Sequence, residues 1–406
     1  MNGGLLKEQK VNVIHHGDSL EVAKDLEQES IHQIVCSPPY YGNQRNYHLG
    51  DDELGREKNP ADYIRKLVNI FHNLRPALKK EGTLWIVIGD KWKNGLQLRI
   101  PNKLVDALEL DGWYFVEEIT WQKNNLMPVP YKNRPVVDYE KVLFLAKSKK
   151  HYFEPQYEPY SPESFSEMGK EYNGKDVKDY DYGGAPKPGD VKRNTIKSMS
   201  MPPIGGVKKA GGDNPTYSGN TPEFNFGRGR LMRAVWNINT QQYHGAHFAV
   251  YPVPLAERMI LFGCPFKYCL RCGKALRPVY SEWSFPTRKG NTRKAESKSG
   301  TVVDPNKRLH DAEISTKRIR LVRWLAGYEK DCKCEEPLEH GVVLDPFMGT
   351  GTTAIAAMMN GRKFIGIELS SDYVNQAYER IYQDKYKKKY YDFKNGSYQS
   401  RIELFA

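Results

Sequence analysis

The stretch GVVLDPFMGTGTTAIAAMMNGRKFIGIELS, residues 341–370, carries the clearest structural pattern in the chain. An apolar run stops at Asp345, glycines follow at Gly349 and Gly351, and a helical segment leads into a second apolar run that ends at Glu368. Glycines let a backbone approach a ligand closely, and the free amides of the next helix favour an anionic group. An acid after the second strand can accept bonds from both hydroxyls of a ribose. The pattern predicts a nucleoside site, although a plain strand-to-helix turn or a nicotinamide dinucleotide site has a similar signature.

The chain before residue 152 alternates between segments typical of strands and of helices. Strands are expected at 11–18, 32–40, 83–90 and 139–148, with a strand pair at 113–123, and helices are expected from an N-cap at Ser19, at about 60–80 and at 101–111. The run at 83–90 is apolar throughout, as in a strand that is buried on both faces of a sheet. This alternation predicts a doubly wound, Rossmann-like α/β sheet with helices on both faces.

The composition excludes several classes of protein. The chain has 406 residues, 39% of them hydrophobic and 12% aromatic, so it is too long for one ordinary domain and too aromatic for a disordered chain. It has no apolar stretch of about 18 residues and no apolar signal core at its N-terminus, so we expect no membrane span and a cytoplasmic location. The formal net charge of +12 favours a polyanionic partner.

A second motif lies in IVCSPPYYGNQRNY, residues 34–47, where Ser37, Pro38, Pro39 and Tyr40 follow an apolar strand. The prolines fix the backbone and remove amide donors, so the preceding carbonyls are free to accept hydrogen bonds. A hydroxyl, a carbonyl and an aromatic face form a site for an exocyclic amine on a planar ring. Alone, the tetrapeptide could be a strand-ending turn. Together with a nucleoside site in the same chain, it indicates a place where such an amine attacks an electrophile.

These motifs resemble those of the amino-methylating DNA methyltransferases that use S-adenosyl-L-methionine, in the circularly permuted arrangement called the β class. In that class the catalytic S/D/N-P-P-Y/F comes first, a target-recognition region follows, and the F-x-G-x-G cofactor turn comes last. Here SPPY stands at 37–40 and FMGTG at 347–351, in that order. The resemblance covers roughly residues 11–153 and 233–383. Within the family, the chain is similar in particular to the branch that reads SPPYYG, which is found in restriction–modification systems and phages.

The resemblance implies a role for each matching residue. The methionine moiety of the cofactor would be lined by Asp345, Phe347, Gly349, Gly351 and Thr352, with Glu368 at the ribose, Asp18 near the adenine, and Phe248 to Pro252 over the methionine end. Ser37 to Tyr40 would hold the target amine of a base flipped out of double-stranded DNA. The amine would attack the sulfonium methyl in line, so positioning would provide most of the rate. Cys36 is expected to be a buried thiol and not a nucleophile.

Serine at position 37 favours cytosine N4 in this family, whereas aspartate there favours adenine N6. Adenine N6 stays the alternative, because either amine fits a hydroxyl and a carbonyl. One further alternative is an enzyme that methylates RNA or a protein glutamine amide, which uses the related motif N-P-P-Y. Another is a catalytically silent, zinc-bearing DNA-binding protein. The serine and the permuted order argue against methylation of RNA or protein. The intact FMGTG argues against a silent DNA-binding protein. A restriction–modification context would add a cognate restriction endonuclease as a partner, while the recognition sequence and the oligomeric state stay open.

The cysteines predict a structural zinc site. Cys269-x-x-Cys272-Gly is half of a zinc knuckle, and Cys332-x-Cys334 follows about 60 residues later. Four thiolates close a tetrahedral zinc site, although the second pair has one spacer residue where two are usual. Cys264 is either a further ligand or a core thiol, and free thiols are the alternative for the whole set. Disulfides are not expected in a chain without a secretion signal.

Two regions are candidates for DNA contact. The segment 288–323 has eleven Lys or Arg against four Asp or Glu, which favours phosphate binding over a merely solvated face. Its candidate phosphate contacts are Lys289, Arg293, Lys294 and Lys298. The Gly-, Pro- and Tyr-rich region 152–232 is compatible with a linker, but the resemblance implies a target-recognition insert. Its candidates for base edges are Lys192, Arg193, Arg228 and Arg230.

These motifs divide the chain into five parts. Residues 1–151 are expected to form the catalytic half of the methyltransferase domain, and residues 152–232 the target-recognition region. The cofactor-binding half is expected to consist of 233–263, with a helix at 248–262, and 340–383. Residues 264–339 are expected to form a small zinc-ribbon-like, basic insert, and residues 384–406 a basic tail.

Overall fold

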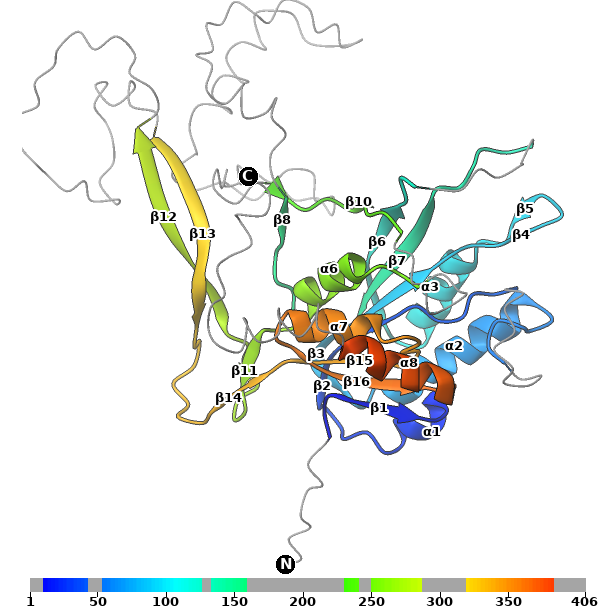
Figure 1. Ribbon diagram of the computed structural model, residues 1–406, viewed down its shortest axis with the longest axis horizontal. Helices are drawn as coiled ribbons and strands as arrows, with labels where there is room; N and C mark the ends of the chain where they lie inside the picture. Colours follow the sequence, from blue (N-terminus) through cyan, green and yellow to red (C-terminus); the bar gives the residue numbers. More distant parts are fainter. Residues whose placement is uncertain are drawn as a thin grey trace, which may run out of the picture. The chain divides into compact units, whose positions relative to one another are not determined.

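The computed structural model describes residues 10–42, 53–125, 133–158, 230–240, 250–286 and 319–382 (Figure 1). The chain divides into two compact units. The larger contains 1–156, 232–279 and 327–406, and the smaller contains 157–231 and 280–326. None of the helices in the described ranges has the length and apolar character that a membrane crossing requires.

The larger unit is built on an eight-stranded sheet with the order β1-β16-β15-β2-β3-β7-β6-β10. These strands are β1 (Val13–His16), β16 (Lys363–Glu368), β15 (Val342–Asp345), β2 (Ile31–Cys36), β3 (Leu78–Ile88), β7 (Tyr139–Ala146), β6 (Tyr114–Gln122) and β10 (Val235–Asn237). The first five in this order run parallel, β7 is antiparallel to both β3 and β6, and β10 is parallel to β6. The sheet is therefore mixed, with its parallel half formed by both ends of the sequence.

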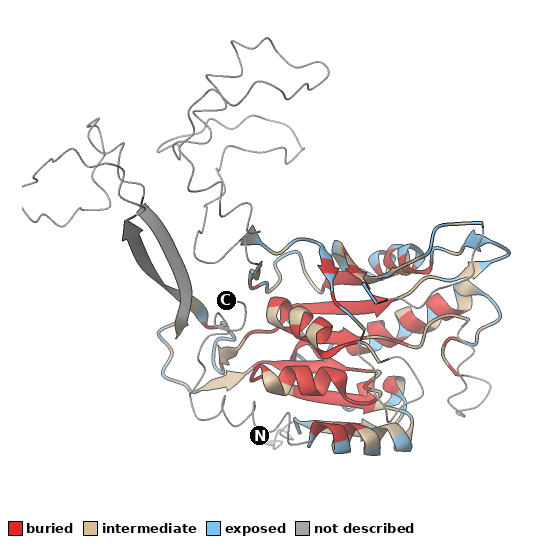
Figure 2. Cartoon of the chain, turned by 45° about the horizontal axis from the view of Figure 1, so that its top comes forward, coloured by how far each residue is buried: buried red, intermediate tan, exposed pale blue. Residues whose placement is uncertain are grey.

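Helices cover both faces of this sheet, as the sequence predicts. One face carries α1 (Ser19–Ala23), α2 (Pro60–Leu74) and α3 (Ile100–Leu110), and the other carries α6 (Val253–Gly263), α7 (Thr352–Met359) and α8 (Ser371–Ile381). Figure 2 shows the strands buried between these two helical layers. All six residues of β2 are buried, with Ile34 and Cys36 in the core under α2 and Val35 in the core under α6. A strand enclosed on both faces needs such an unbroken apolar run.

Four two-stranded sheets complete the described part of the chain. They pair β4 (Trp92–Lys93) with β5 (Leu96–Gln97), β8 (Tyr157–Glu158) with β9 (Arg230–Leu231), β11 (Lys267–Cys269) with β14 (Leu338–His340), and β12 (Arg277–Pro286) with β13 (Ile319–Glu329).

Aromatic stacking fixes the helical layer that contains α6. The buried Trp85 ring on β3 stacks on Phe144 of β7 at 4.1 Å between centroids and on Phe262 of α6 at 6.0 Å. Trp236 of β10 stacks on Phe262 at 5.8 Å. These rings connect β3, β7 and β10 with α6, so segments far apart in the sequence share one core.

Several expected boundaries are wrong. The helix expected at 248–262 begins only at Val253, after its N-cap Pro252. The helix that begins at Pro60, capped by Asn59 through the amide of Asp62, ends at Leu74, and Leu78 already belongs to β3. The first helix is capped by Asp18, because its carboxylate accepts from the amide of Leu20. Ser19 lies inside that helix, which ends at Ala23. The expected strand pair at 113–123 is one strand, β6, with a bulge between Phe115 and Glu117.

Helix α3 offers a matched test of this layering. Leu108 is fully buried, whereas Leu110 in the same turn is 90% exposed. Leu108→Ala should lower the free energy of unfolding by about 2–5 kcal/mol, because it leaves a cavity in the core. Leu110→Ala should change it by less than about 0.5 kcal/mol. Urea unfolding of both variants measures the difference, and equal losses would contradict the arrangement of α3 on the sheet.

Candidate active site

The carboxyl ends of four neighbouring parallel strands meet at one edge of the sheet. Asp18 follows β1, Glu368 ends β16, Asp345 ends β15 and Ser37 follows β2. Ligands of open α/β sheets bind at this edge, next to the loops that leave the strands. Both sequence motifs therefore reach the same edge, from strands that are direct neighbours.

The glycine turn between β15 and α7 has the geometry that only glycine adopts easily. Gly349 and Gly351 have φ angles of +51° and +82°. A Cβ atom on Gly351 would lie 3.1 Å from the Cβ of Ala377, whereas a Cβ on Gly349 would meet nothing closer than the carbonyl of Phe347 at 4.0 Å. The space over Gly349 is thus open toward a ligand. The turn itself is pinned because the Gly349 amide donates to Glu368 at 2.7 Å.

Buried Arg380 of α8 stabilises this turn through hydrogen bonds. Its guanidinium donates to the carbonyl of Thr350 at 3.1 Å and to the hydroxyl of Thr352 at 2.8 Å. Sequence reasoning missed this residue, because a basic residue in the last turn of a helix is ordinary dipole compensation. Arg380 reaches the glycine turn only because α8 packs against that turn.

Asp345 is fully buried at the end of β15. Its carboxylate accepts from the amide of Phe347 at 2.9 Å and from the hydroxyls of Thr353 and Tyr251. Burial raises the pKa of Asp345 to about 7, an effect that these donors oppose and the nearby charge of Glu368 increases. Tyr251 lies in the predicted range Phe248 to Pro252, and its hydroxyl reaches Asp345 although the two residues are 94 positions apart in the chain.

Two acids lie beside the glycine turn. Burial raises the pKa of Glu368, while the backbone amides of Ser370 and Gly349, which donate to its two oxygens, counteract the shift. Asp18 stands one strand away, since His16 of β1 pairs with Glu368. One Asp18 oxygen caps α1 by accepting from Leu20 at 2.8 Å. The site thus presents two carboxylates at the edge where a nucleoside would lie.

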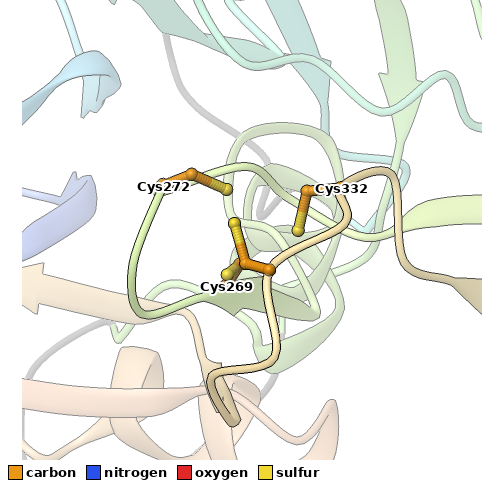
Figure 3. Close-up of side chains that lie close together, drawn as sticks. Cys269, Cys272 and Cys332 are labelled. Atoms are coloured by element: carbon orange, nitrogen blue, oxygen red, sulfur yellow. The ribbon is translucent and has the colours of Figure 1, made fainter.

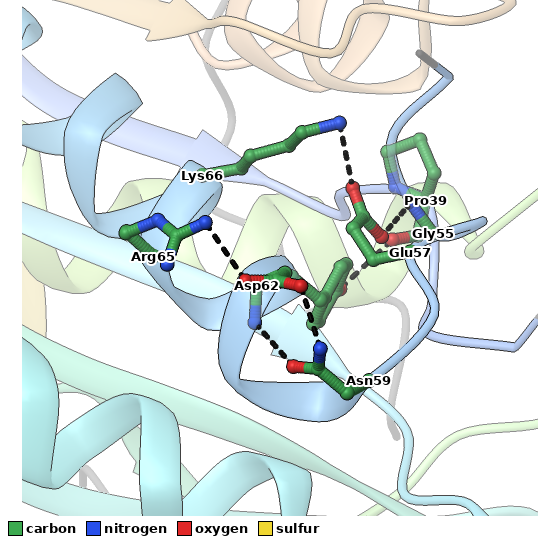
Figure 4. Close-up of polar contacts among 8 residues, drawn as sticks. Pro39, Gly55, Glu57, Asn59, Asp62, Arg65 and Lys66 are labelled. Atoms are coloured by element: carbon green, nitrogen blue, oxygen red, sulfur yellow. Dashed lines mark hydrogen bonds and ion pairs between the residues drawn. The ribbon is translucent and has the colours of Figure 1, made fainter. Parts of the chain in front are cut away.

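The SPPY segment is braced by the loop that precedes α2. Tyr63 donates its hydroxyl to the carbonyl of Pro39 at 2.8 Å. Gly55, with φ of +97°, approaches so closely that a Cβ there would lie 2.6 Å from the carbonyl of Tyr40. Figure 4 shows how Glu57 holds this loop, through the Gly55 amide at 2.9 Å and the Lys66 ammonium at 3.3 Å. The backbone of the tetrapeptide is therefore fixed by residues 55–66.

The Tyr40 ring is held on two sides. Its edge lies against the backbone of Gly89, where an added Cβ would be 2.9 Å from a ring carbon. Its hydroxyl donates to Glu140 on β7 at 2.7 Å and lies 3.4 Å from the Ser37 hydroxyl. Lys123, at the end of β6, pairs with the other Glu140 oxygen. Burial and the neighbouring Glu140 raise the pKa of Tyr40 well above its usual value. The hydroxyl therefore stays protonated and can donate to Glu140.

Glu140 and Lys123 were not found by sequence reasoning. The only signal in the sequence is a charged pair, Glu140-Lys141, at the start of an otherwise apolar strand, which usually marks a solvated strand end. A cavity of about 630 Å³ opens beside Tyr40 at this place. Its charged lining consists of Asp90, Lys91, Lys123, Arg134, Glu140 and Lys141.

Cys36 and Cys264 are both buried free thiols. Cys36 is fully buried one residue before Ser37, and burial together with nearby Asp345 raises the pKa of its thiol well above the usual range. This agrees with the expectation of an inert thiol. Cys264 is also buried, with its pKa raised to about 12 by burial.

Four other cysteines come together away from this edge. The Sγ atoms of Cys269, Cys272, Cys332 and Cys334 all lie within 4.8 Å of one another, and Cys264 is not in this group (Figure 3). All four thiols are free.

Several expected contacts lie outside the described residues. These are Phe248 at the cofactor site and Lys192, Arg193, Arg228, Lys289, Arg293, Lys294 and Lys298 as DNA contacts. Arg230 begins β9, paired with Glu158 of β8.

The raised pKa of Asp345 gives a testable dependence of stability on pH. With a pKa of about 7 in the folded state against 3.8 ordinarily, the native state binds the proton more tightly than the unfolded chain. The free energy of unfolding should therefore fall as pH rises from about 4 to about 7, by an amount on the order of a few kcal/mol. Asp345→Asn, which cannot ionise, should lack this part of the loss. Urea unfolding at pH 5 and pH 8 compares the two proteins, and parallel pH profiles would contradict the assignment.

Comparison with known proteins shows which family the chain belongs to. The sequence profile of the DNA methylase family N6_N4_Mtase matches residues 31–265 and 281–379. The type II methyltransferase M.SmaI of Serratia marcescens is 26% identical over 394 residues, which are 90% of this chain and 89% of that protein. The type II methyltransferase M.Cfr9I of Citrobacter freundii is 24% identical and covers 91% of this chain and 87% of its own length.

Solved structures give a similar alignment over nearly the whole chain. The cytosine-N4-specific PvuII DNA methyltransferase aligns with a TM-score of 0.47 at 14% identity, covering 95% of this chain and 94% of its own. A DNA modification methylase of Thermus thermophilus, complexed with S-adenosyl-L-methionine, aligns with a TM-score of 0.42 at 18% identity, covering 93% of this chain and 95% of its own. Because the family profile matches well over half of the sequence, the chain belongs to the N6_N4 DNA methylase family.

Proposed function

We propose that the chain transfers the methyl group of S-adenosyl-L-methionine to the exocyclic N4 amine of a cytosine in double-stranded DNA. The observation that carries this proposal is the pairing of β2 with β15, which puts the SPPY segment and the glycine turn on adjacent strand ends. A donor of a methyl group and an amine acceptor must meet in one place for direct transfer, and this edge offers both sites.

The glycine turn suits a nucleoside-containing cofactor. The open space over Gly349 admits a ligand against the backbone, and Glu368 lies beside it to accept from ribose hydroxyls. Asp18, one strand further, is assigned to the adenine end. The cofactor supplies an electrophilic methyl group when bound. The protein's own contribution at this end is to orient that group through Gly349, Glu368 and buried Asp345.

The SPPY segment suits the acceptor amine. The Ser37 hydroxyl and the Pro38 carbonyl accept from the two amine hydrogens, so the nitrogen lone pair is free to point at the methyl group. Flipping the base out of the duplex costs a few kcal/mol, and stacking on Tyr40 returns roughly 1–3 kcal/mol. Glu140, balanced by Lys123, fixes the tilt of the Tyr40 ring, and the cavity beside the ring gives the base room.

Cytosine N4 is preferred over adenine N6 because serine heads the tetrapeptide, as the resemblance implies. The arrangement of hydroxyl, carbonyl and ring would also accept adenine, which is therefore the alternative substrate. The circularly permuted form of the fold is part of the same proposal. Its support is that β15, which carries the glycine turn, lies inside the sheet although it comes near the end of the chain, after β2 and SPPY.

Target recognition is assigned to the region 152–232, and DNA phosphate contact to the basic run 288–323. The support for both comes from the sequence, since they lie largely outside the described residues. The type II relatives make a restriction–modification system the expected setting, with a cognate restriction endonuclease as the partner.

Mass spectrometry of nucleosides tests the substrate directly. DNA incubated with the protein and cofactor carrying a deuterated methyl group should yield labelled N4-methyl-2′-deoxycytidine. Labelled N6-methyladenine would select the alternative substrate. Tight cofactor binding without any label in DNA would instead favour a silent DNA-binding protein.

Cofactor binding should depend on Glu368. Glu368→Gln keeps the side-chain size but removes the charge and one acceptor, so S-adenosyl-L-methionine should bind at least about tenfold more weakly, the cost of one charge-assisted bond. Glu379→Gln, at an exposed position of α8, serves as the control and should bind normally. Calorimetry measures both. Equal affinity in the two variants would place the ribose elsewhere.

Catalysis should depend on the fixed Tyr40 ring. Ser37→Ala and Tyr40→Ala should reduce kcat by about 10²-fold or more with little change in cofactor affinity, because both groups act on the base. Tyr40→Phe and Glu140→Gln should cause smaller losses, and the double variant should be no worse than Tyr40→Phe alone, because both changes act on the same Tyr40–Glu140 hydrogen bond. Cys36→Ala should keep most of its activity. Single-turnover methylation measures the series, and additive losses in the double variant would show that Glu140 acts independently of Tyr40.

A further inference from the structure

Four thiols that the proposed methyl transfer does not use lie together in the larger unit. Their Sγ atoms, from Cys269, Cys272, Cys332 and Cys334, are all within 4.8 Å of one another, and in Figure 3 those of the labelled residues point toward one another. A tetrahedral ion with zinc–sulfur bonds of about 2.3 Å needs sulfurs about 3.8 Å apart. The largest separation therefore has to close by only about 1 Å for all four to meet one ion.

The backbone around the thiols already presents donors to sulfur. The amides of Arg271 and Cys272 donate to the Cys269 sulfur, and the amide of Cys334 donates to the Cys332 sulfur. Gly273, at φ of +70°, closes the first turn by donating to the carbonyl of Cys269 at 2.9 Å. The second pair reaches the first with a single spacer residue, since all four Sγ atoms lie within 4.8 Å of one another, so its short spacing is no obstacle.

The two segments that carry the thiols have almost no apolar core of their own. In 267–276 and 328–340, the buried apolar side chains are Cys269 and Leu276, while Leu270 is 51% exposed. The short β11–β14 pairing and exposed ion pairs, such as Arg271 with Glu336 at 3.2 Å, join the segments. Exposed ion pairs contribute little, and two short strands without a core are marginal. A metal would supply the missing stabilisation.

We propose that Cys269, Cys272, Cys332 and Cys334 bind one Zn²⁺ as thiolates, and that this ion is structural. It fastens β11, which follows α6, to the segment that leads into β15. Each thiol gives up its proton to solvent as its sulfur–zinc bond forms, and no oxidation or reduction is involved.

The location of the cluster separates it from the proposed chemistry. Tyr268 of β11 packs on His32, at the start of β2, with ring centroids 4.3 Å apart. β14 ends at His340, two residues before β15 begins at Val342. Ser37 and Asp345 lie at the opposite ends of those same strands. Four protein ligands also leave no open position on the ion, as in structural rather than catalytic zinc sites.

The experiment uses the full-length protein, purified with a thiol reductant. Elemental analysis should find about one zinc per chain, by the four-thiolate rule. Protein loaded with Co²⁺ alone should show the intense visible bands of a tetrahedral tetrathiolate, a readout that needs no variant. Cys272→Ser with Cys334→Ser, one ligand from each pair, should lose nearly all bound zinc. Cys264→Ala removes a buried thiol outside the cluster and should keep about one equivalent.

Each outcome decides between zinc and free thiols. Absence of zinc from reduced, zinc-exposed protein, or a Co²⁺ spectrum with fewer than four sulfur ligands, would overturn the proposal. So would a doubly substituted variant that retains its zinc. If that variant does not fold, the stoichiometry and the Co²⁺ spectrum of the unaltered protein still decide. These readouts do not involve methyl transfer, so failure of the zinc site and failure of the proposed activity are distinguishable.

Discussion

Parallel pairing of β2 with β15 brings together two strand ends that lie more than 300 residues apart in the chain. Buried polar contacts secure this pairing. His32 accepts from the amide of Val342 at 3.1 Å, and Gln33 donates to the carbonyl of Met259 in α6 at 2.7 Å. Burial lowers the pKa of His32 well below its usual value, so the ring stays neutral and can accept. A one-residue slip would leave these groups unpaired in the core and would turn every side chain of β2 to the other face.

The rest of the site follows from that register. Because β2 pairs with β15, the tetrapeptide and the glycine turn follow adjacent strand ends. Each side is then held by its own supports. Tyr63 and Gly55 fix the backbone of SPPY, while Arg380 and Glu368 fix the glycine turn. Rigid support on both sides is what in-line transfer requires, since small misplacements of reacting atoms are costly.

The two edges of the sheet carry different features. The loops at the carboxyl ends of the parallel strands carry the acids, the SPPY segment and the cavity. At the opposite edge, the chain leaves after α6 through β11 and returns through β14 into β15. The return must be well anchored, because β15 carries the glycine turn only a few residues later. Close packing at Gly341, where a Cβ would lie 2.3 Å from the carbonyl of Pro265, contributes to that anchoring.

The sequence alone determines the local pieces of this protein: the apolar runs of β2, β3 and β15, the glycine turn, SPPY and the two cysteine pairs. These features depend on the few residues around them, so patterns and turn chemistry are enough to predict them. The sequence does not predict the ends of α1 and α2 correctly, because several residues near each end carry competing signals. Asp18 and Ser19, for example, are both common helix N-caps. Only the tertiary structure decides that Glu140, Lys123 and Arg380 join the site. Their side chains reach it from other strands and helices, and which residue arrives is set by strand register and helix packing, which no local pattern contains.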